Sequence, residues 1–290
     1  LHFFQSIGVN LVEGYGQTEG TGVTCVSRVG KVKFGTVGPP ITGTQIKIAD
    51  DGEILVKSPS VFKGYYKNPE STAETIQDGW LYSGDVGEID EDGYLKITDR
   101  KKDIIVTAGG KNITPQYIEN KLKFCPYIVE TVVLGHEQDY VTTMICIDYK
   151  HVGKWAEDHR ISYTTYSDLA SNRQVYDLIE REVVRVNRTL PEKARIQKFL
   201  LLYKELDADD EELTRTKKIR RAFISEKYVK EISALYGDVE EIPIEAVIRY
   251  QDGKTATLRT NLRIRVMNLH ETEKAELEKQ GFWRRLGRRS

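Results

Sequence analysis

A run of six polar residues at positions 98–103, Thr-Asp-Arg-Lys-Lys-Asp, separates two apolar segments of the sequence. Such a run cannot be buried in either neighbouring core, so it predicts an exposed linker. The chain has 290 residues, which suits two domains of ordinary size. The sequence therefore favours two compact parts that meet near residue 101.

The part before the linker has the pattern of short strands. Val9, Leu11 and Val12 predict a short buried strand, and the glycine-rich residues that follow are typical of loops and short strands. Asp-Gly turns near residues 52 and 93 interrupt alternating apolar segments, which predicts hairpins over 45–56 and 86–97. These hairpins indicate an antiparallel β-subdomain spanning about 40–98.

The part after the linker alternates between strands and helices. Thr114-Pro115 predicts a helix start, with Ile118 and Leu122 on one face at i, i+4. A further hairpin is expected to pair residues 244–248 with the strand that follows. The other predicted elements are strands at 104–106, 128–135, 141–149 and 198–203, and helices near 151–159 and 172–188. This mixture predicts a compact α+β domain.

Composition excludes several classes of protein. The 43 basic and 44 acidic residues give a net charge of −1, so no general field favours nucleic acid. Cys25, Cys125 and Cys146 are too far apart for a C-x-x-C site, and their sparse, odd count favours a reducing cytoplasm. No apolar run approaches the roughly 20 residues of a membrane-spanning helix. The sequence begins without methionine or a signal pattern, so we expect it to be part of a longer polypeptide.

Four short motifs occur in a characteristic order. They are Tyr15-Gly16-Gln17-Thr18-Glu19, Tyr82-Ser83-Gly84-Asp85, residues 99–103 leading to Gly109-Gly110, and residues 212–221, Glu-Leu-Thr-Arg-Thr-Lys-Lys-Ile-Arg-Arg. Each motif alone also fits a polar turn or a solvated charge run. Together, from residue 1 to about 236, they resemble the adenylate-forming (AMP-binding) superfamily of acyl-CoA synthetases, luciferases and peptide-synthetase adenylation domains. Within it the chain is most similar to the bacterial long-chain fatty-acid–CoA ligases.

The resemblance implies a mixed α/β and α+β architecture with three regions. Residues 1–101 would be the end of the large AMP-binding domain with its β-subdomain, and 102–236 the small mobile C-terminal domain. Residues 237–290 would add a β-hairpin extension and a basic tail. The family's phosphate loop, ending in Pro-Lys-Gly, does not occur in this sequence. The chain would then be the C-terminal half of a synthetase, and inactive alone.

The resemblance also assigns roles at the nucleotide site. In the first motif Glu19 would bind Mg²⁺ and Thr18 the α-phosphate, Tyr15 would lie near adenine, and Gly16 belongs to the same nucleotide-binding segment. Asp85 would accept hydrogen bonds from the ribose hydroxyls. Arg100 would donate to ribose and phosphate oxygens as AMP forms, because a guanidinium can serve two oxygens at once.

Three further positions concern the small domain. Lys102 matches the hinge about which that domain rotates, and Lys218 matches the catalytic lysine. The residue before the catalytic lysine is usually glycine or apolar, whereas Lys217 precedes it here, which leaves a one-residue ambiguity. Gly109 and Gly110 would let the backbone approach the pantetheine arm of CoA closely, although a simple hairpin turn needs the same two glycines.

The expected function is ATP-dependent ligation of a fatty acid to CoA in the cytoplasm, with ATP, Mg²⁺ and CoA and without nucleic acid. The alternatives are an adenylating enzyme for another carboxylic acid and an inactive nucleotide-binding or interaction module. Residues 273–290 carry six basic and three acidic residues interleaved with Phe282, Trp283 and Leu286. This tail predicts peripheral contact with the inner membrane, with a solvated tail as the alternative.

Overall fold

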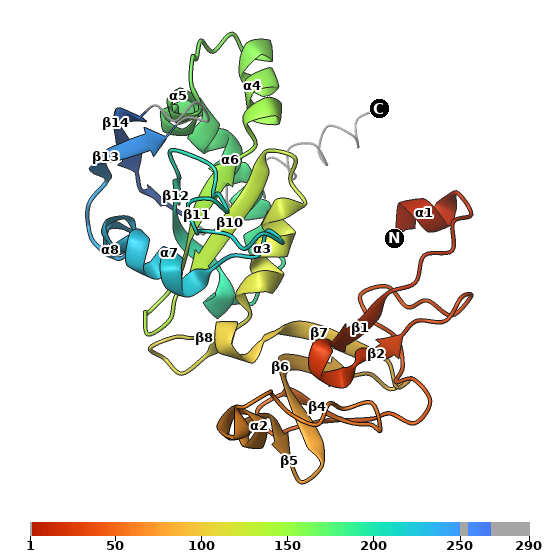
Figure 1. Ribbon diagram of the computed structural model, residues 1–290. Coiled ribbons are helices and arrows are strands. Elements are labelled where there is room, and N and C mark those ends of the chain that lie inside the picture. Colours follow the sequence, from red (N-terminus) through yellow and green to blue (C-terminus); the bar gives the residue numbers. More distant parts are fainter. Residues whose placement is uncertain (1, 250–254, 268–290) are drawn as a thin grey trace. The chain divides into compact units, whose positions relative to one another are not determined.

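The computed structural model describes residues 2–249 and 255–267. The chain forms two compact units, Leu1–Ile104 and Ile105–Ser290 (Figure 1). The division falls close to the polar run of the sequence. The three regions proposed from the sequence, 1–101, 102–236 and 237–290, stay predictions about domains.

The first unit begins with the short helix α1 (His2–Ser6) and an irregular segment. The buried strand predicted at Val9–Val12 is wrong: Val9, Leu11 and Val12 are exposed, and no described strand pairs with this segment. The first ordered hairpin follows, with β1 (Gly14–Gln17) antiparallel to β2 (Gly22–Val26). A 3₁₀ turn, Thr18–Gly20, joins the two strands.

A five-stranded antiparallel sheet forms the body of the first unit. Its strands are β3 (Gln45–Ile48), β4 (Glu53–Lys57), β5 (Ile76–Gln77), β6 (Trp80–Ile89) and β7 (Leu95–Arg100). The order is β3-β4-β6-β5, with β7 also paired to β6. Ile48 pairs with Ile54 and Ile89 with Leu95, so both hairpins predicted from the Asp-Gly turns are confirmed. Helix α2 (Pro69–Thr75) precedes β5, and the Asn68 side chain caps its first turn.

One apolar cluster holds the β1–β2 hairpin against this sheet. Tyr15 and Cys25 from the hairpin pack with Ile54, Leu81 and Leu95 of the sheet. Burial of apolar side chains between the two parts stabilises their arrangement. The first motif is thereby fixed beside β6 and β7, which carry the second and third.

The polar run at 98–103 is only partly a linker. Thr98, Asp99 and Arg100 belong to β7, and the Asp99 side chain is buried, against the expectation of an exposed segment. The carboxylate of Asp99 accepts a hydrogen bond from the N–H of Arg100, which offsets the cost of burying it. The exposed linker therefore begins at Lys101, in the short 3₁₀ turn Lys101–Asp103.

The second unit is an α+β domain, as predicted. Its first elements are β8 (Ile105–Val106), β9 (Asn112–Ile113), α3 (Pro115–Lys123), β10 (Ile128–Leu134), β11 (Val141–Ile147), α4 (Tyr149–Asp158), α5 (Tyr166–Ser171) and α6 (Arg173–Asn187). A 3₁₀ turn (Glu192–Ala194) then precedes β12 (Ile196–Leu201), α7 (Arg221–Lys227), α8 (Val229–Tyr236), β13 (Glu241–Arg249), β14 (Thr255–Arg263) and β15 (Arg265–Val266). The helix predicted at Thr114-Pro115 is confirmed, although the Thr114 side chain makes no capping hydrogen bond.

The second unit has a four-stranded sheet in the order β10-β11-β12-β15, and apolar clusters lie on both of its faces. Alternate residues of β11 face opposite sides, so Ile145 joins the cluster formed with α3 and α6, whereas Met144 joins the cluster formed with α7 and α8. All seven residues of β11 are buried, as expected for a strand covered on both faces.

The last hairpin is also confirmed, since β13 pairs with β14 in register from Glu241 opposite Arg263 to Arg249 opposite Thr255. Its predicted turn and the predicted basic tail lie outside the described residues. Immediately after the hairpin, β15 pairs with β12 and becomes an edge of the central sheet. Among the described helices, none combines the length and apolar character needed to cross a membrane.

Candidate functional site

The first motif folds as a strand that ends in a 3₁₀ turn. Gly16 is required at the strand end because a Cβ there would lie 1.7 Å from the carbonyl oxygen of Gly22 on the opposite strand. The pairing of β1 with β2 shifts register between Tyr15 and Gly16, after which Gly16 pairs with Val23 and Gln17 with Gly22 before the chain enters the 3₁₀ turn. Thr18 is therefore exposed and Glu19 half-buried at the hairpin tip.

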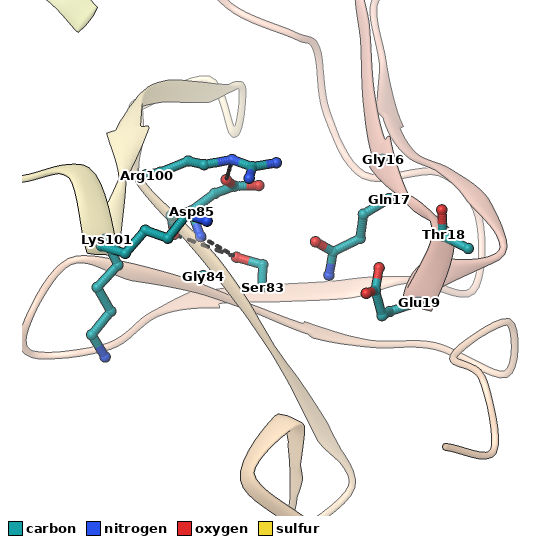
Figure 2. A pocket seen from close by; sticks show the side chains of 10 residues that line it. Gly16, Gln17, Thr18, Glu19, Ser83, Gly84, Asp85, Arg100 and Lys101 are labelled. Carbon is teal, nitrogen blue, oxygen red and sulfur yellow. Dashed lines mark hydrogen bonds and ion pairs between the residues drawn. The ribbon is translucent and has the colours of Figure 1, made fainter. Parts of the chain in front are cut away.

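The second motif lies in the middle of the long strand β6. Gly84 has φ +71°, a conformation that glycine adopts without strain. The N–H of Asp85 donates to the Ser83 hydroxyl at 3.1 Å, and Asp85 pairs with Arg100 of β7 across the ladder. This local turn brings the Asp85 carboxylate beside the guanidinium of Arg100 (Figure 2).

Tyr15 connects the first two motifs. Its hydroxyl donates to Oδ2 of Asp85 at 2.7 Å, while Nε of Arg100 lies 3.6 Å from Oδ1 of the same carboxylate. Burial and the hydrogen bond to Asp85 raise the pKa of Tyr15 well above its ordinary value. The tyrosine hydroxyl therefore remains a proton donor that holds the aspartate in place. Its hydroxyl contacts the Asp85 carboxylate, which is expected to accept the ribose hydroxyls, and the expected place of the Tyr15 ring near adenine stays a prediction.

These segments surround one open cavity of about 610 Å³. Figure 2 shows Glu19 and Gln17 on one side and Asp85, Arg100 and Lys101 on the other. Six of the positions expected in the site from the sequence line it. The full lining is Gly16, Gln17, Thr18, Glu19, Ser83, Gly84, Asp85, Arg100, Lys101 and Lys102. The cavity contains carboxylates, hydroxyls and cations, which suits a polar, phosphorylated ligand.

Glu19 is held by a residue that sequence reasoning missed. The hydroxyl of Tyr65 donates to Oε1 of Glu19 at 2.8 Å, and the main-chain carbonyl of Glu19 accepts the N–H of Phe62. The hydrogen bond to Glu19 raises the pKa of Tyr65. No sequence signal identifies Tyr65, because it lies 46 positions from Glu19 in an irregular segment.

Lys101 forms a second contact that the sequence did not predict. Its ammonium lies 2.7 Å from carboxylates of both Asp51 and Glu53, and Glu53 also accepts the N–H of Gly84 at 2.9 Å. These hydrogen bonds raise the pKa of Lys101, and that to Lys101 lowers the pKa of Asp51. Through these contacts Glu53 of β4 binds both Lys101, at the start of the linker, and the backbone of Gly84.

No group of three or more His, Cys, Asp or Glu side chains within the described ranges could by itself hold a metal ion. A carboxylate such as Glu19 could still share a cation with ligand oxygens, as Mg²⁺ usually does. Its position on the cavity wall fits that chemistry, since the described protein supplies few further carboxylates there.

Gly109, Gly110 and Lys218 belong to the second unit. The two glycines form the β8–β9 turn, where Gly110 has φ +69° and its N–H donates to the carbonyl of Thr107. The turn is exposed, and a Cβ at Gly109 would meet no atom within 4 Å.

Lys218 lies at the end of a tight loop between Leu213 and Ile219, which form an isolated antiparallel bridge. Within the loop, the N–H of Thr214 donates to the carbonyl of Lys218 at 2.8 Å and the N–H of Lys218 to the Thr214 hydroxyl at 3.0 Å. Lys217 has φ +59°, a left-handed conformation that favours glycine. The Lys218 side chain is exposed.

Comparison with known proteins gives consistent matches over both units. The family model for AMP-binding enzymes matches residues 1–66, and the model for the AMP-binding enzyme C-terminal domain matches residues 102–240. A long-chain-fatty-acid–CoA ligase of Mycobacterium bovis is 39% identical over 236 residues, which is 81% of this chain and 39% of that protein. Human long-chain-fatty-acid–CoA ligase 1 is 33% identical over 250 residues, a match that covers 81% of this chain and 36% of the human protein.

Solved structures show the same fold. The adenylation domain of a carboxylate reductase from Mycobacterium chelonae has a TM-score of 0.64 at 22% identity, covering 82% of this chain and 36% of its own. An o-succinylbenzoate CoA synthetase from Bacillus subtilis in complex with AMP has a TM-score of 0.57 at 22% identity, covering 76% and 42%. The expected mixed α/β and α+β fold is thus confirmed, and the chain spans about two fifths of the length of its curated relatives. By its motifs, its fold and both matching domain models, the chain belongs to the AMP-binding enzyme family.

Proposed function

We propose that this chain is the carboxyl-terminal part of an ATP-dependent acyl-CoA synthetase that activates a fatty acid and transfers it to CoA. The proposal rests on one observation: Thr18, Glu19, Asp85 and Arg100 line the same cavity. Relatives that are 33–39% identical are named long-chain-fatty-acid–CoA ligases, which supports a fatty acid as the substrate. The share of those relatives that the chain covers, and its lack of a Pro-Lys-Gly loop, support its being a part of the enzyme.

The reaction has two steps with different electrostatic demands. In the first step the fatty-acid carboxylate attacks the α-phosphorus of ATP, a P–O bond forms, and the bond to pyrophosphate breaks. In the second step the sulfur of CoA attacks the acyl carbon, the thiol loses its proton, and AMP leaves. Because two anions approach each other in the first step, that step requires cations and N–H donors near the α-phosphate.

The cavity of the first unit would hold the nucleotide. The Asp85 carboxylate, oriented by the Tyr15 hydroxyl, would accept hydrogen bonds from the ribose hydroxyls. Arg100 would donate to ribose and phosphate oxygens, since its guanidinium contacts Asp85 only at 3.6 Å and is about half exposed. Thr18, exposed at the hairpin tip beside Gly16, would donate its hydroxyl to the α-phosphate.

Glu19 is the proposed ligand for Mg²⁺. Tyr65 occupies one side of Oε1, and the carboxylate faces the cavity (Figure 2). When bound, Mg²⁺ would offset the phosphate charge and favour departure of pyrophosphate. Within this chain Glu19 would position the phosphates, and Tyr65 would keep the carboxylate turned towards them.

Lys218 is the proposed catalytic lysine of the first step. Its ammonium would lie between the attacking carboxylate and the α-phosphate and offset their repulsion. The left-handed φ of Lys217 supports this register, because the family's glycine commonly precedes the catalytic lysine and glycine adopts that conformation easily. Lys217 would then replace that glycine.

The second unit would present two surfaces in turn. We propose that the loop with Lys218 serves adenylation and that the Gly109-Gly110 turn serves thioester formation, where the open space around Gly109 admits the pantetheine arm. Lys102 would be the pivot, because it is exposed and directly follows Lys101, which is anchored to Asp51 and Glu53.

Single-turnover assays of each half-reaction in the full-length enzyme test this proposal. Lys218→Ala should slow adenylate formation about 10²- to 10³-fold and largely spare thioester formation from supplied acyl-adenylate. Lys102→Pro should do the reverse, because proline fixes φ at the pivot. Lys217→Ala is the matched control and should retain both steps. Equal loss of both steps in Lys218→Ala would contradict the two-surface mechanism, and selective loss in Lys217→Ala would shift the register by one residue.

The same preparation separates the alternative functions. A nucleotide-binding module without catalysis would bind AMP but show no ATP–pyrophosphate exchange with any acid. An enzyme for another carboxylic acid would exchange with aromatic or branched acids in preference to fatty acids.

Peripheral membrane contact by the basic tail stays a prediction from the sequence. Equal sedimentation with anionic vesicles before and after removal of residues 281–290 would contradict it.

A further inference from the structure

The loop that carries Lys218 is attached to the second unit by two buried carboxylates, one at each end. Glu212, fully buried just before the loop, accepts the Lys204 and Lys227 ammonium groups at 2.8 Å and the Tyr228 hydroxyl at 2.6 Å. It also accepts the N–H of Asp207 at 2.9 Å. The main-chain carbonyl of Glu212 accepts the N–H of Arg220, so the two strands of the loop are tied together at this point.

At the other end of the loop, Arg221 is the first residue of α7 and contacts Glu119 of α3. Nη2 of Arg221 lies 2.7 Å from both oxygens of the Glu119 carboxylate. The Glu119 side chain is only 3% exposed and that of Arg221 19% exposed. Burial raises the pKa of Glu119, and the adjacent guanidinium opposes that rise. Charge-assisted contacts of this kind are short and directional.

Glu119 and Arg221 also contact the edge of the central sheet. Glu119 accepts the N–H of Val133 at 2.9 Å, and Nη1 of Arg221 donates to the carbonyl of Val133 at 3.2 Å. Val133 lies on β10, an edge strand, so these groups have no partner on a further strand of the described sheet. Arg221 is therefore fixed by a side chain and a backbone group at once, three residues after Lys218.

We propose that Glu119 is a positioning residue for Lys218, acting through Arg221 to hold the loop 214–218 in the conformation that presents the lysine ammonium. This inference rests on the proposed function of Lys218. The loop's own hydrogen bonds are few and exposed, and the left-handed Lys217 within it is strained. A loop of this kind keeps one conformation only if its ends are fixed. A displacement of about 1 Å at a reacting group can reduce the rate of a step about 10²-fold.

Loop order is measured first in the 290-residue chain, by amide hydrogen exchange. Glu119→Gln keeps the size of the side chain but removes its charge, so the amides of Thr214, Lys218 and Arg220 should exchange about 10-fold faster or more. The matched control is Glu180→Gln, which removes one of the two carboxylate partners of Arg265 at the opposite, β15 edge of the same sheet. The control should leave these amides unchanged. Unchanged exchange in Glu119→Gln would overturn the proposal.

The catalytic test is a double-mutant comparison in the full-length enzyme. Glu119→Gln alone should slow adenylate formation about 10- to 100-fold with little change in the KM for ATP. In a Lys218→Ala background the same change should have no further effect, because a residue acting only through Lys218 has nothing left to position. Glu180→Gln should leave adenylate formation unchanged in both backgrounds.

The outcomes separate the two ideas. An equal loss from Glu119→Gln in both backgrounds would show a general structural role and overturn the positioning role. If Lys218→Ala left adenylation intact, the proposed function of the lysine would fail, while the exchange measurement would still judge whether Glu119 orders the loop.

Discussion

Replacing Gly16 by alanine should destabilise the first unit strongly, because the backbone of the opposite strand of the β1–β2 hairpin lies close to this residue. The new Cβ would lie 1.7 Å from the carbonyl oxygen of Gly22, 2.7 Å from its carbonyl carbon and 2.9 Å from Cα of Val23. All three are backbone atoms, so no side-chain rotation relieves the contact. The strands must separate by more than about 1 Å, since real Cβ contacts are essentially never shorter than 3.0 Å.

The magnitude follows from what this separation breaks. Overpacking costs about 1–3 kcal/mol. Separation also weakens the ladder where Gly16 pairs with Val23 and Gln17 with Gly22, at about 1 kcal/mol for each hydrogen bond. We therefore expect the free energy of unfolding of the first unit to fall by about 3–5 kcal/mol. The affinity for AMP should fall with it, because Gly16 lines the cavity.

Urea unfolding followed by Trp80 fluorescence measures this change, with Trp155 and Trp283 replaced by phenylalanine so that only the first unit reports. Gly20→Ala is the matched control in the same hairpin. Its Cβ would meet only the Thr24 hydroxyl at 3.3 Å and the Gln17 side chain at 4.0 Å, which can move. The control should cost less than about 1 kcal/mol. A Gly16→Ala variant within about 0.5 kcal/mol of its parent would refute the close approach of the strands.

Three further changes test other contacts. Burial opposes ionisation of Glu212, but its hydrogen bonds lower its pKa. Its stabilising effect is therefore present above the ordinary carboxyl pKa and lost as the pH falls through the folded value. Thermal unfolding reported by Trp155 should show this loss of stability at low pH. Glu212→Gln should remove the pH dependence and lower the stability at neutral pH by about 3 kcal/mol, and a variant with the same pH profile as its parent would contradict this role of Glu212. Lys217→Gly should raise stability by about 1 kcal/mol in the same assay by relieving φ +59°, whereas Arg215→Gly should lower it; destabilisation by both would show that the left-handed residue is not strained. Tyr15→Phe should cost the first unit about 1.5–3 kcal/mol and weaken AMP binding by calorimetry, since Asp85 loses its donor; unchanged affinity would separate Tyr15 from the nucleotide site.

Local patterns predicted the Asp-Gly hairpins, whereas contacts distant in sequence escaped prediction. Asp-Gly turns with alternating apolar residues specify hairpins, and β3–β4 and β6–β7 follow them. The strand predicted at 9–12 failed because apolar residues form a strand only where a neighbouring strand accepts their hydrogen bonds. Asp99 was assigned to an exposed linker, yet it is buried in β7. Burial depends on which segment covers a residue, which a charge run does not reveal.

The site shows the same division. The motifs identified Thr18, Glu19, Asp85 and Arg100, which line one cavity. They gave no sign of the contact from Tyr65 to Glu19, because side chains from separate segments meet only after folding. The roles of these residues in catalysis stay predictions.

The pairing of β15 with β12 bears on how the chain can be divided for experiments or recombined with relatives. The C-terminal family model ends at residue 240, but the sheet that it describes is completed by residues beyond that point. A chain cut at 240 would leave the edge of β12 open and remove Ile244, Leu262 and Ile264 from the apolar cluster around α7 and α8. Open strand edges beside exposed apolar surface promote self-association. The end of the family model at residue 240 therefore differs from the end of the structural unit, which includes β15. Chimaeras made with this chain should exchange it through at least residue 267.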